Sequence, residues 1–96
     1  MNNIMKSLDE MKKELVKQGY SEIYEWTDNP NYEYPSHKHD TDTTLIVLEG
    51  EITVTIEGKT KKYSTGETVF VPAHKNHYAK VGSKGASYLV GEERNR

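Results

Sequence analysis

The chain has 96 residues, a net charge of −2 at neutral pH, and hydrophobic residues at 33% of its positions. This length suits a single domain, and the nearly balanced charge argues against a nucleic acid or an anionic membrane as partner. The absence of cysteine excludes disulfides, thiolate metal sites and cysteine nucleophiles, so histidine and carboxylate side chains are the metal ligands that remain.

The sequence also carries signals about location. No apolar stretch is long enough to span a bilayer. Charged side chains such as Lys6 and Asp9 interrupt the N-terminal segment, which a secretory signal would keep apolar. We therefore expect a cytoplasmic protein.

Residues 1–19 are predicted to form an N-terminal α-helix that packs on a sheet. Ser7 and Glu10 have the spacing of a capping box, and a cap at Asn2 or Asn3 is the alternative start. One face of the helix carries the apolar residues Ile4, Leu8, Met11 and Leu15. This stripe is narrow, which favours packing on the sheet over binding to a membrane or a partner.

Residues 20–96 are predicted to form one β-domain of about eight short strands. These strands are expected near residues 23–26, 32–34, 43–48, 52–56, 60–63, 68–71, 76–81 and 86–90. Turn signals separate them, including Glu49-Gly50 and the glycine-containing segment 82–85, and the charged tail from Glu92 is expected to fray. Short strands at even spacing predict an all-β sandwich or barrel.

The four histidines fall in two short stretches, each beside a predicted strand. His37 and His39 are two residues apart, so both imidazoles face the same side of an extended strand. His77 shares a face with the small apolar residues Ala79 and Val81, which predicts that it also points inward. Imidazole binds zinc, iron, nickel and copper, and a catalytic metal needs about three protein ligands and an open position. The three histidines therefore form a predicted metal site, and the alternative is a metal-free polar pocket.

The first two histidines belong to a longer pattern. It begins at Asn31, continues through His37-Lys38-His39 and Thr43, and ends at Gly50. Five residues separate Asn31 from the first histidine, three separate the second histidine from Thr43, and six separate Thr43 from Gly50. The run Val47-Leu48-Glu49-Gly50-Glu51 surrounds the end of this pattern.

A second pattern runs from Gly66 through Pro72 and His74 to His77. Together the two patterns resemble the two motifs of a small single-domain cupin. The resemblance covers residues 31–77 and extends more loosely into the last predicted strand, which is well over half of the chain.

This resemblance implies a cupin jelly-roll β-barrel, all-β apart from the short helix at residues 1–19, with residues 20–96 as the single cupin domain. It implies a divalent metal ion inside the barrel, zinc, iron, nickel or manganese, bound by His37, His39 and His77. It also implies a homodimer, because many small cupins pair.

The chain departs from the cupin pattern at three positions. Asn31 and His74 stand where the motifs have glycine, so His74 requires either positive φ or a different loop. Thr43 stands where the first motif has a glutamate ligand, which makes the site similar to three-histidine cupins such as thiol dioxygenases. Asp42, or its neighbour Asp40, is a candidate replacement for that carboxylate, and Thr43 is a candidate to hydrogen-bond a metal-bound water. His74 is either an additional ligand, a proton shuttle or a solvated loop residue.

The sequence thus predicts a metal-binding cupin that binds or transforms a small anionic or oxygen-donor molecule by oxygen activation or Lewis-acid chemistry. A non-enzymatic small-molecule-binding or sensing cupin without a catalytic metal is the alternative, and a mainly structural dimer is a third. Trp26 is expected in the core or in a dimer interface. The tyrosines are expected there too, although four of them are candidates to line the barrel mouth: Tyr24, Tyr34, Tyr78 and Tyr88.

Overall fold

The computed structural model describes residues 6–94 of the chain. Within this range it has one helix and six strands, which are α1 (Leu8–Lys17), β1 (Tyr20–Asp28), β2 (Glu33–His37), β3 (Thr43–Ile56), β4 (Lys59–Ser64), β5 (Thr68–Val71) and β6 (His77–Arg94). The predicted all-β barrel with a short N-terminal helix is confirmed. The predicted number of strands is wrong, because two pairs of short strands are single long strands.

Helix α1 begins at the predicted capping box. The Ser7 hydroxyl accepts a hydrogen bond from the backbone N–H of Glu10 at 3.2 Å, and the Glu10 carboxylate accepts one from the backbone N–H of Ser7 at 2.9 Å. These bonds satisfy N–H groups that the first turn leaves without partners. The earlier start at Asn2 or Asn3, and the apolar residue Ile4, lie outside the described residues.

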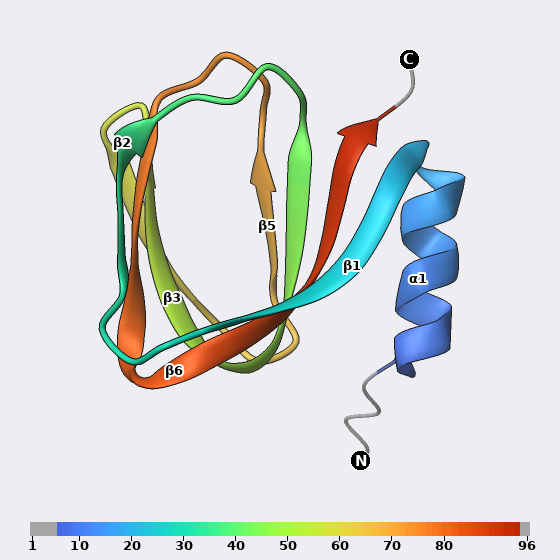
Figure 1. Ribbon diagram of the computed structural model, residues 1–96, viewed down its shortest axis with the longest axis horizontal. Helices are drawn as coiled ribbons and strands as arrows, with labels where there is room; N and C mark the ends of the chain where they lie inside the picture. The colour runs from blue at the N-terminus through green and yellow to red at the C-terminus, as the bar shows by residue number, and fades with distance from the viewer. Residues whose placement is uncertain (1–5, 95–96) are drawn as a thin grey trace.

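The helix packs outside the barrel, alongside β1 (Figure 1). Its buried residues Met11 and Leu15 form a small core with Tyr20, Ile46 and Leu89, which lie on the outer face of the sheet. This second core buries apolar residues of the outer face of the sheet beneath the helix. No helix in residues 6–94 is long and apolar enough to cross a membrane.

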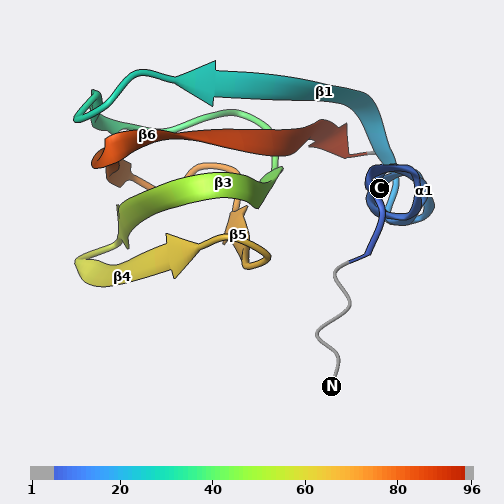
Figure 2. The ribbon, with the colours of Figure 1, turned by 90° about the horizontal axis from the view of Figure 1, so that it is seen from below.

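The strands form one antiparallel sheet that folds over on itself. Strands β3 and β6 pair along almost their whole length, and each passes through a corner halfway (Figure 1). The corner divides this ladder into two halves. In one half β1 pairs with β6 and β5 pairs with β3, and in the other half β2 pairs with β6 and β4 pairs with β3. Figure 2 shows the strands stacked in the order β1, β6, β3 and β4, with α1 at one end. The two halves face each other and enclose the interior.

The corners replace two predicted turns. Glu49-Gly50 does not reverse the chain; it lies in β3, where the register with β6 shifts on both sides of it. Gly50 has φ +79°, and a Cβ atom there would lie 2.0 Å from the carbonyl oxygen of Gly85. The segment 82–85 is likewise a bend inside β6. Gly50 and Gly85 predict turns because a turn and a bend within a strand both favour a residue that has no side chain and adopts positive φ.

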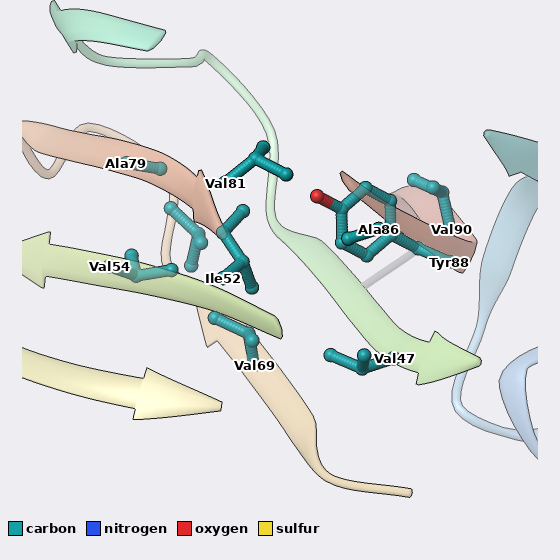
Figure 3. Packing of buried hydrophobic residues seen from close by; sticks show 10 residues of the cluster. Val47, Ile52, Val54, Val69, Ala79, Val81, Ala86, Tyr88 and Val90 are labelled. Carbon is teal, nitrogen blue, oxygen red and sulfur yellow. The ribbon is translucent and has the colours of Figure 1, made fainter. Parts of the chain in front are cut away.

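The main core fills the space between the two halves of the sheet. Alternate residues of β3, β5 and β6 point inward and are buried, and ten of them form one cluster, nine of which Figure 3 labels: Val47, Ile52, Val54, Val69, Ala79, Val81, Ala86, Tyr88 and Val90. Burial of these side chains is the main force that holds the two halves together.

The predicted frayed tail is also wrong for its described part. Strand β6 continues to Arg94 and pairs with β1, where Glu92 lies opposite Glu22. The Ser21 hydroxyl also donates a hydrogen bond to the carbonyl of Glu93 at 2.8 Å. Pairing with β1 satisfies the backbone of this charged segment, which composition alone does not reveal. Residues 95–96 lie outside the described range.

Candidate metal centre

The structure brings the three predicted histidines together at one end of the barrel. His37 is the last residue of β2 and lies opposite His77, the first residue of β6. His39 follows in the loop that leads to β3. The ring centroids are 4.2 Å apart for His37 and His77, 4.7 Å for His37 and His39, and 4.9 Å for His39 and His77. One nitrogen from each ring lies within 4.8 Å of the others.

Backbone carbonyls orient two of these rings. His37 Nδ1 lies 2.6 Å from the carbonyl oxygen of Pro35, and His77 Nδ1 lies 3.3 Å from that of Lys75. A carbonyl oxygen only accepts hydrogen bonds, so each Nδ1 carries the proton and each Nε2 keeps its lone pair. This arrangement is typical of metal-binding histidines, whose second nitrogen is held by a protein acceptor.

The facing nitrogens have a spacing that suits one ion. His37 Nε2 and His39 Nε2 are 3.0 Å apart, so in the metal-free protein His39 Nε2–H donates a hydrogen bond to His37 Nε2, and an ion would replace that proton. Two nitrogens bound to the same tetrahedral zinc ion are ~3.3 Å apart, given zinc–nitrogen bonds of about 2.0–2.1 Å. The donor set of three imidazoles, their orientation and their spacing therefore fit a divalent metal ion.

The surroundings of His39 and His77 favour the neutral imidazole, which is the form that binds a metal. Burial lowers the pKa of His39, and the neighbouring His37 lowers it further, against opposing effects of Glu92 and Asp40. Burial also lowers the pKa of His77, which is 8% exposed, while its hydrogen bond to the Lys75 carbonyl acts in the other direction.

A cavity of about 260 Å³ adjoins the histidines. Much of its wall is apolar and is formed by inward-facing residues of β3, β5 and β6: Leu45, Ile52, Val54, Val71, Ala79 and Val90. Tyr24 and Trp26 of β1 also line it, yet they are 38% and 52% exposed. The cavity is therefore open to solvent on the side of β1.

A buried carboxylate lies at the wall of this cavity. Asp28 is 8% exposed, and its Oδ1 accepts a hydrogen bond from Trp26 Nε1 at 2.9 Å. The Tyr34 hydroxyl lies 2.7 Å from both carboxylate oxygens, and the Tyr88 hydroxyl donates to Oδ2 at 3.0 Å. Burial, together with the hydrogen bond and charge of Asp28, raises the pKa of both tyrosines, so they stay protonated and donate. Three donors thus hold Asp28 in place.

The other predicted site residues lie elsewhere. His74 is exposed and is absent from the three-histidine group; its backbone has φ +65° and donates its N–H to the carbonyl of His39 at 2.8 Å. Asp42 is buried, and its Oδ1 accepts the backbone N–H of Ala73 at 2.8 Å, which ties together the loops that carry His39 and His74. Asn31 has φ +61°, so it and His74 both adopt the left-handed backbone of the glycines they replace.

Thr43 lines the cavity. Its hydroxyl oxygen is buried and has no hydrogen-bond partner within residues 6–94. Three of the four tyrosines expected at the mouth line the cavity, namely Tyr24, Tyr34 and Tyr88. Tyr78 does not line it, and its hydroxyl donates a hydrogen bond to the carboxylate of Glu33.

Sequence reasoning missed three residues that line the cavity: Trp26, Asp28 and Glu92. The period of two along β1 was an available signal, because Tyr24, Trp26 and Asp28 share one face of that strand. Glu92 gave no such signal, since a charged residue near a chain end resembles a solvated tail.

Comparisons with known proteins agree with this architecture. The family model for the cupin domain matches residues 24–90. The chain belongs to the cupin family. Among solved structures, an RmlC-like cupin from Shewanella frigidimarina is 26% identical with a TM-score of 0.67, and the match covers 77% of this chain and 66% of that one. The DMSP lyase DddQ from Ruegeria pomeroyi is 24% identical with a TM-score of 0.68, over 76% of this cupin and 37% of that chain.

One curated relative also matches. Endoribonuclease YbeY from Myxococcus xanthus is 33% identical over 57 residues, which is 59% of this cupin but 19% of that protein. The chain thus spans about a fifth of the length of that relative. The match adds no activity to the site described above.

Proposed function

We propose that this cupin binds a divalent metal ion through His37, His39 and His77 and uses it to bind or transform a small molecule in the adjoining cavity. One observation carries the proposal. Three imidazoles, two of them oriented by backbone carbonyls, meet at the wall of a cavity that is open to solvent. Membership of the cupin family and the shared fold of the lyase DddQ support it.

A bound divalent ion with open coordination positions would supply Lewis-acid polarisation or oxygen activation. The residues that line the cavity would position the bound molecule and limit the access of water to it. The apolar wall would exclude water and pack against the hydrocarbon part of a ligand. The cavity of about 260 Å³ lies below the usual range of drug-sized sites, which favours a small metabolite.

A non-enzymatic binding or sensing role is the second candidate. It is favoured by the state of Asp28, because the three hydrogen bonds from Trp26, Tyr34 and Tyr88 leave this carboxylate poorly placed to accept a proton from a ligand. Binding of a small molecule to metal-free protein without turnover would favour this role. The homodimer and the cytoplasmic location are also proposals, which rest on the resemblance and on composition.

The metal content of protein purified without an affinity tag tests the proposed function. We expect about one divalent ion per chain by elemental analysis, and loss of the ion when His37 and His39 are both replaced by alanine. The matched control is His74→Asn, which removes an exposed histidine and keeps a residue that tolerates positive φ. Metal at a small fraction of one ion per chain, unchanged by the double substitution, would contradict the proposal.

A further inference from the structure

Glu92 points into the barrel and lines the cavity that adjoins the three histidines, although it does not belong to the group whose donor atoms lie within 4.8 Å of one another. Along β6 its strand neighbours Tyr88 and Val90, two and four residues earlier, are both buried in the inner core, and the alternation continues to Glu92. Glu92 also lies directly opposite Thr43 of β3, and opposite residues of paired strands share a face. Both residues line the cavity that adjoins the histidines.

The ends of the ladder between β3 and β6 explain how Glu92 comes near the histidines. One end pairs Ile56 with His77, and the other pairs Thr43 with Glu92. Because both strands turn through the corner, the two ends return to the same end of the barrel (Figure 1). His77 and Glu92 therefore lie at the same end of the barrel, on opposite halves of the sheet.

Glu92 is one of two carboxylates that line this cavity within residues 6–94. The other, Asp28, is already held by three donors. Glu92 is half-buried and interacts with the hydroxyl of Tyr24, at the open side. Burial and then the charge and hydrogen bond of Glu92 raise the pKa of Tyr24 to about 12.

Three neutral imidazoles leave a divalent ion with its full charge beside an apolar wall. A charge in such surroundings is costly unless an opposite charge lies near it. A nearby carboxylate reduces this cost and accepts a hydrogen bond or a proton from a molecule bound to the ion.

We propose that Glu92 is the carboxylate of this metal centre, supplied from β6 opposite the buried, unpartnered hydroxyl of Thr43. The proposal rests on the proposed function, because it requires an ion at His37, His39 and His77. When the ion binds, the Glu92 carboxylate gives up its interaction with Tyr24 and turns toward the ion. There it partly neutralises the charge of the ion and accepts a hydrogen bond from the ligand that the ion binds. The carboxylate thereby strengthens metal binding.

Affinity for Zn²⁺, measured by competition with a chromogenic chelator, tests this role without any assay of activity. We expect Glu92→Gln to weaken binding about 10- to 100-fold, as loss of groups around the ligands of a metal typically does. Glu22→Gln is the matched control, because it makes the same substitution at the residue opposite Glu92 on β1, which does not line the cavity. Its affinity should stay within about twofold of the wild type.

A rescue variant distinguishes charge from packing. Thr43→Glu places a carboxylate directly across the strand pair, so the double variant Thr43→Glu/Glu92→Gln should regain most of the affinity. Thermal unfolding of each metal-free variant checks that it is folded. Wild-type affinity in Glu92→Gln, with binding abolished in His37→Ala, would overturn the role of Glu92 while the metal site stands. If Glu92→Gln loses affinity for Zn²⁺ and the added Thr43→Glu does not restore it, the role of Glu92 would also be overturned. Absence of Zn²⁺ binding in every variant and in the wild type would overturn the proposed function itself.

Discussion

At the scale of single residues, backbone carbonyls orient two of the three histidines for metal binding. The carbonyls of Pro35 and Lys75 fix the protons of His37 and His77 on Nδ1, so both Nε2 atoms keep the lone pair that an ion would take. Burial keeps His39 and His77 neutral. The site therefore needs little rearrangement to bind an ion, but burial makes protonation of His39 and His77 unfavourable.

This arrangement predicts a pH dependence of stability in the metal-free protein. The folded-state pKa values of His39 and His77 lie below the ordinary value of 6.5. The unfolded chain therefore binds protons first as the pH falls, so the free energy of unfolding is fully present above about pH 6.5 and decreases below it. Chemical denaturation at several pH values between about 7.5 and 5 measures this slope.

His77→Gln should reduce the slope, and His74→Asn, in the exposed neighbouring loop, is the matched control. A free energy of unfolding that stays flat or rises as the pH falls through this window would show that the imidazoles are not held neutral by the fold.

Some residues of the site were predictable from the sequence and others were not. The spacing of His37 and His39, and the small inward residues that follow His77, were sufficient to identify the three histidines that the structure brings together. Asp28 and Glu92 could not be identified in this way. Their place in the cavity depends on which strands pair and in which register, and these long-range contacts leave no local pattern.

At the scale of elements, the two corners decide the shape of the barrel. Local glycine signals were interpreted as hairpin turns at 49–50 and 82–85, whereas the strands run on through them. A glycine with positive φ is compatible with a turn and with a bend, and only the pairing of β3 with β6 on both sides distinguishes them. The capping box of α1, by contrast, involves neighbours in sequence and was predictable.

The corner predicts a sharp difference between two glycines. Gly50→Ala places a Cβ atom 2.0 Å from the Gly85 carbonyl oxygen at φ +79°, whereas Gly58→Ala meets nothing within 4 Å at φ +81°. We expect Gly58→Ala to cost about 1–2 kcal/mol from backbone strain alone, and Gly50→Ala about 2–5 kcal/mol because backbone atoms must also move. Denaturant unfolding measures both. Equal losses of stability in the two variants would show that the strands do not cross closely at this corner.

At the scale of the whole molecule, the folded-over sheet brings together residues from distant parts of the chain. The histidines come from β2, its following loop and the start of β6, while Thr43 and Glu92 come from the opposite half. The helix packs on the outer face, away from the cavity, so its sequence bears on stability and not on the site. The cupin fold was predictable from the motifs, but cupin barrels host many functions, so the ligand must be inferred from the site.

The presence of a metal ion among His37, His39 and His77 is the central claim, and anomalous diffraction tests it most directly. Crystals of protein purified without an affinity tag would be measured on both sides of the absorption edge of the metal found by elemental analysis, or of zinc after soaking. We predict one strong anomalous peak about 2.0–2.3 Å from the Nε2 atoms of all three histidines. Crystals soaked in excess zinc that show no anomalous peak among these three rings would contradict the claim.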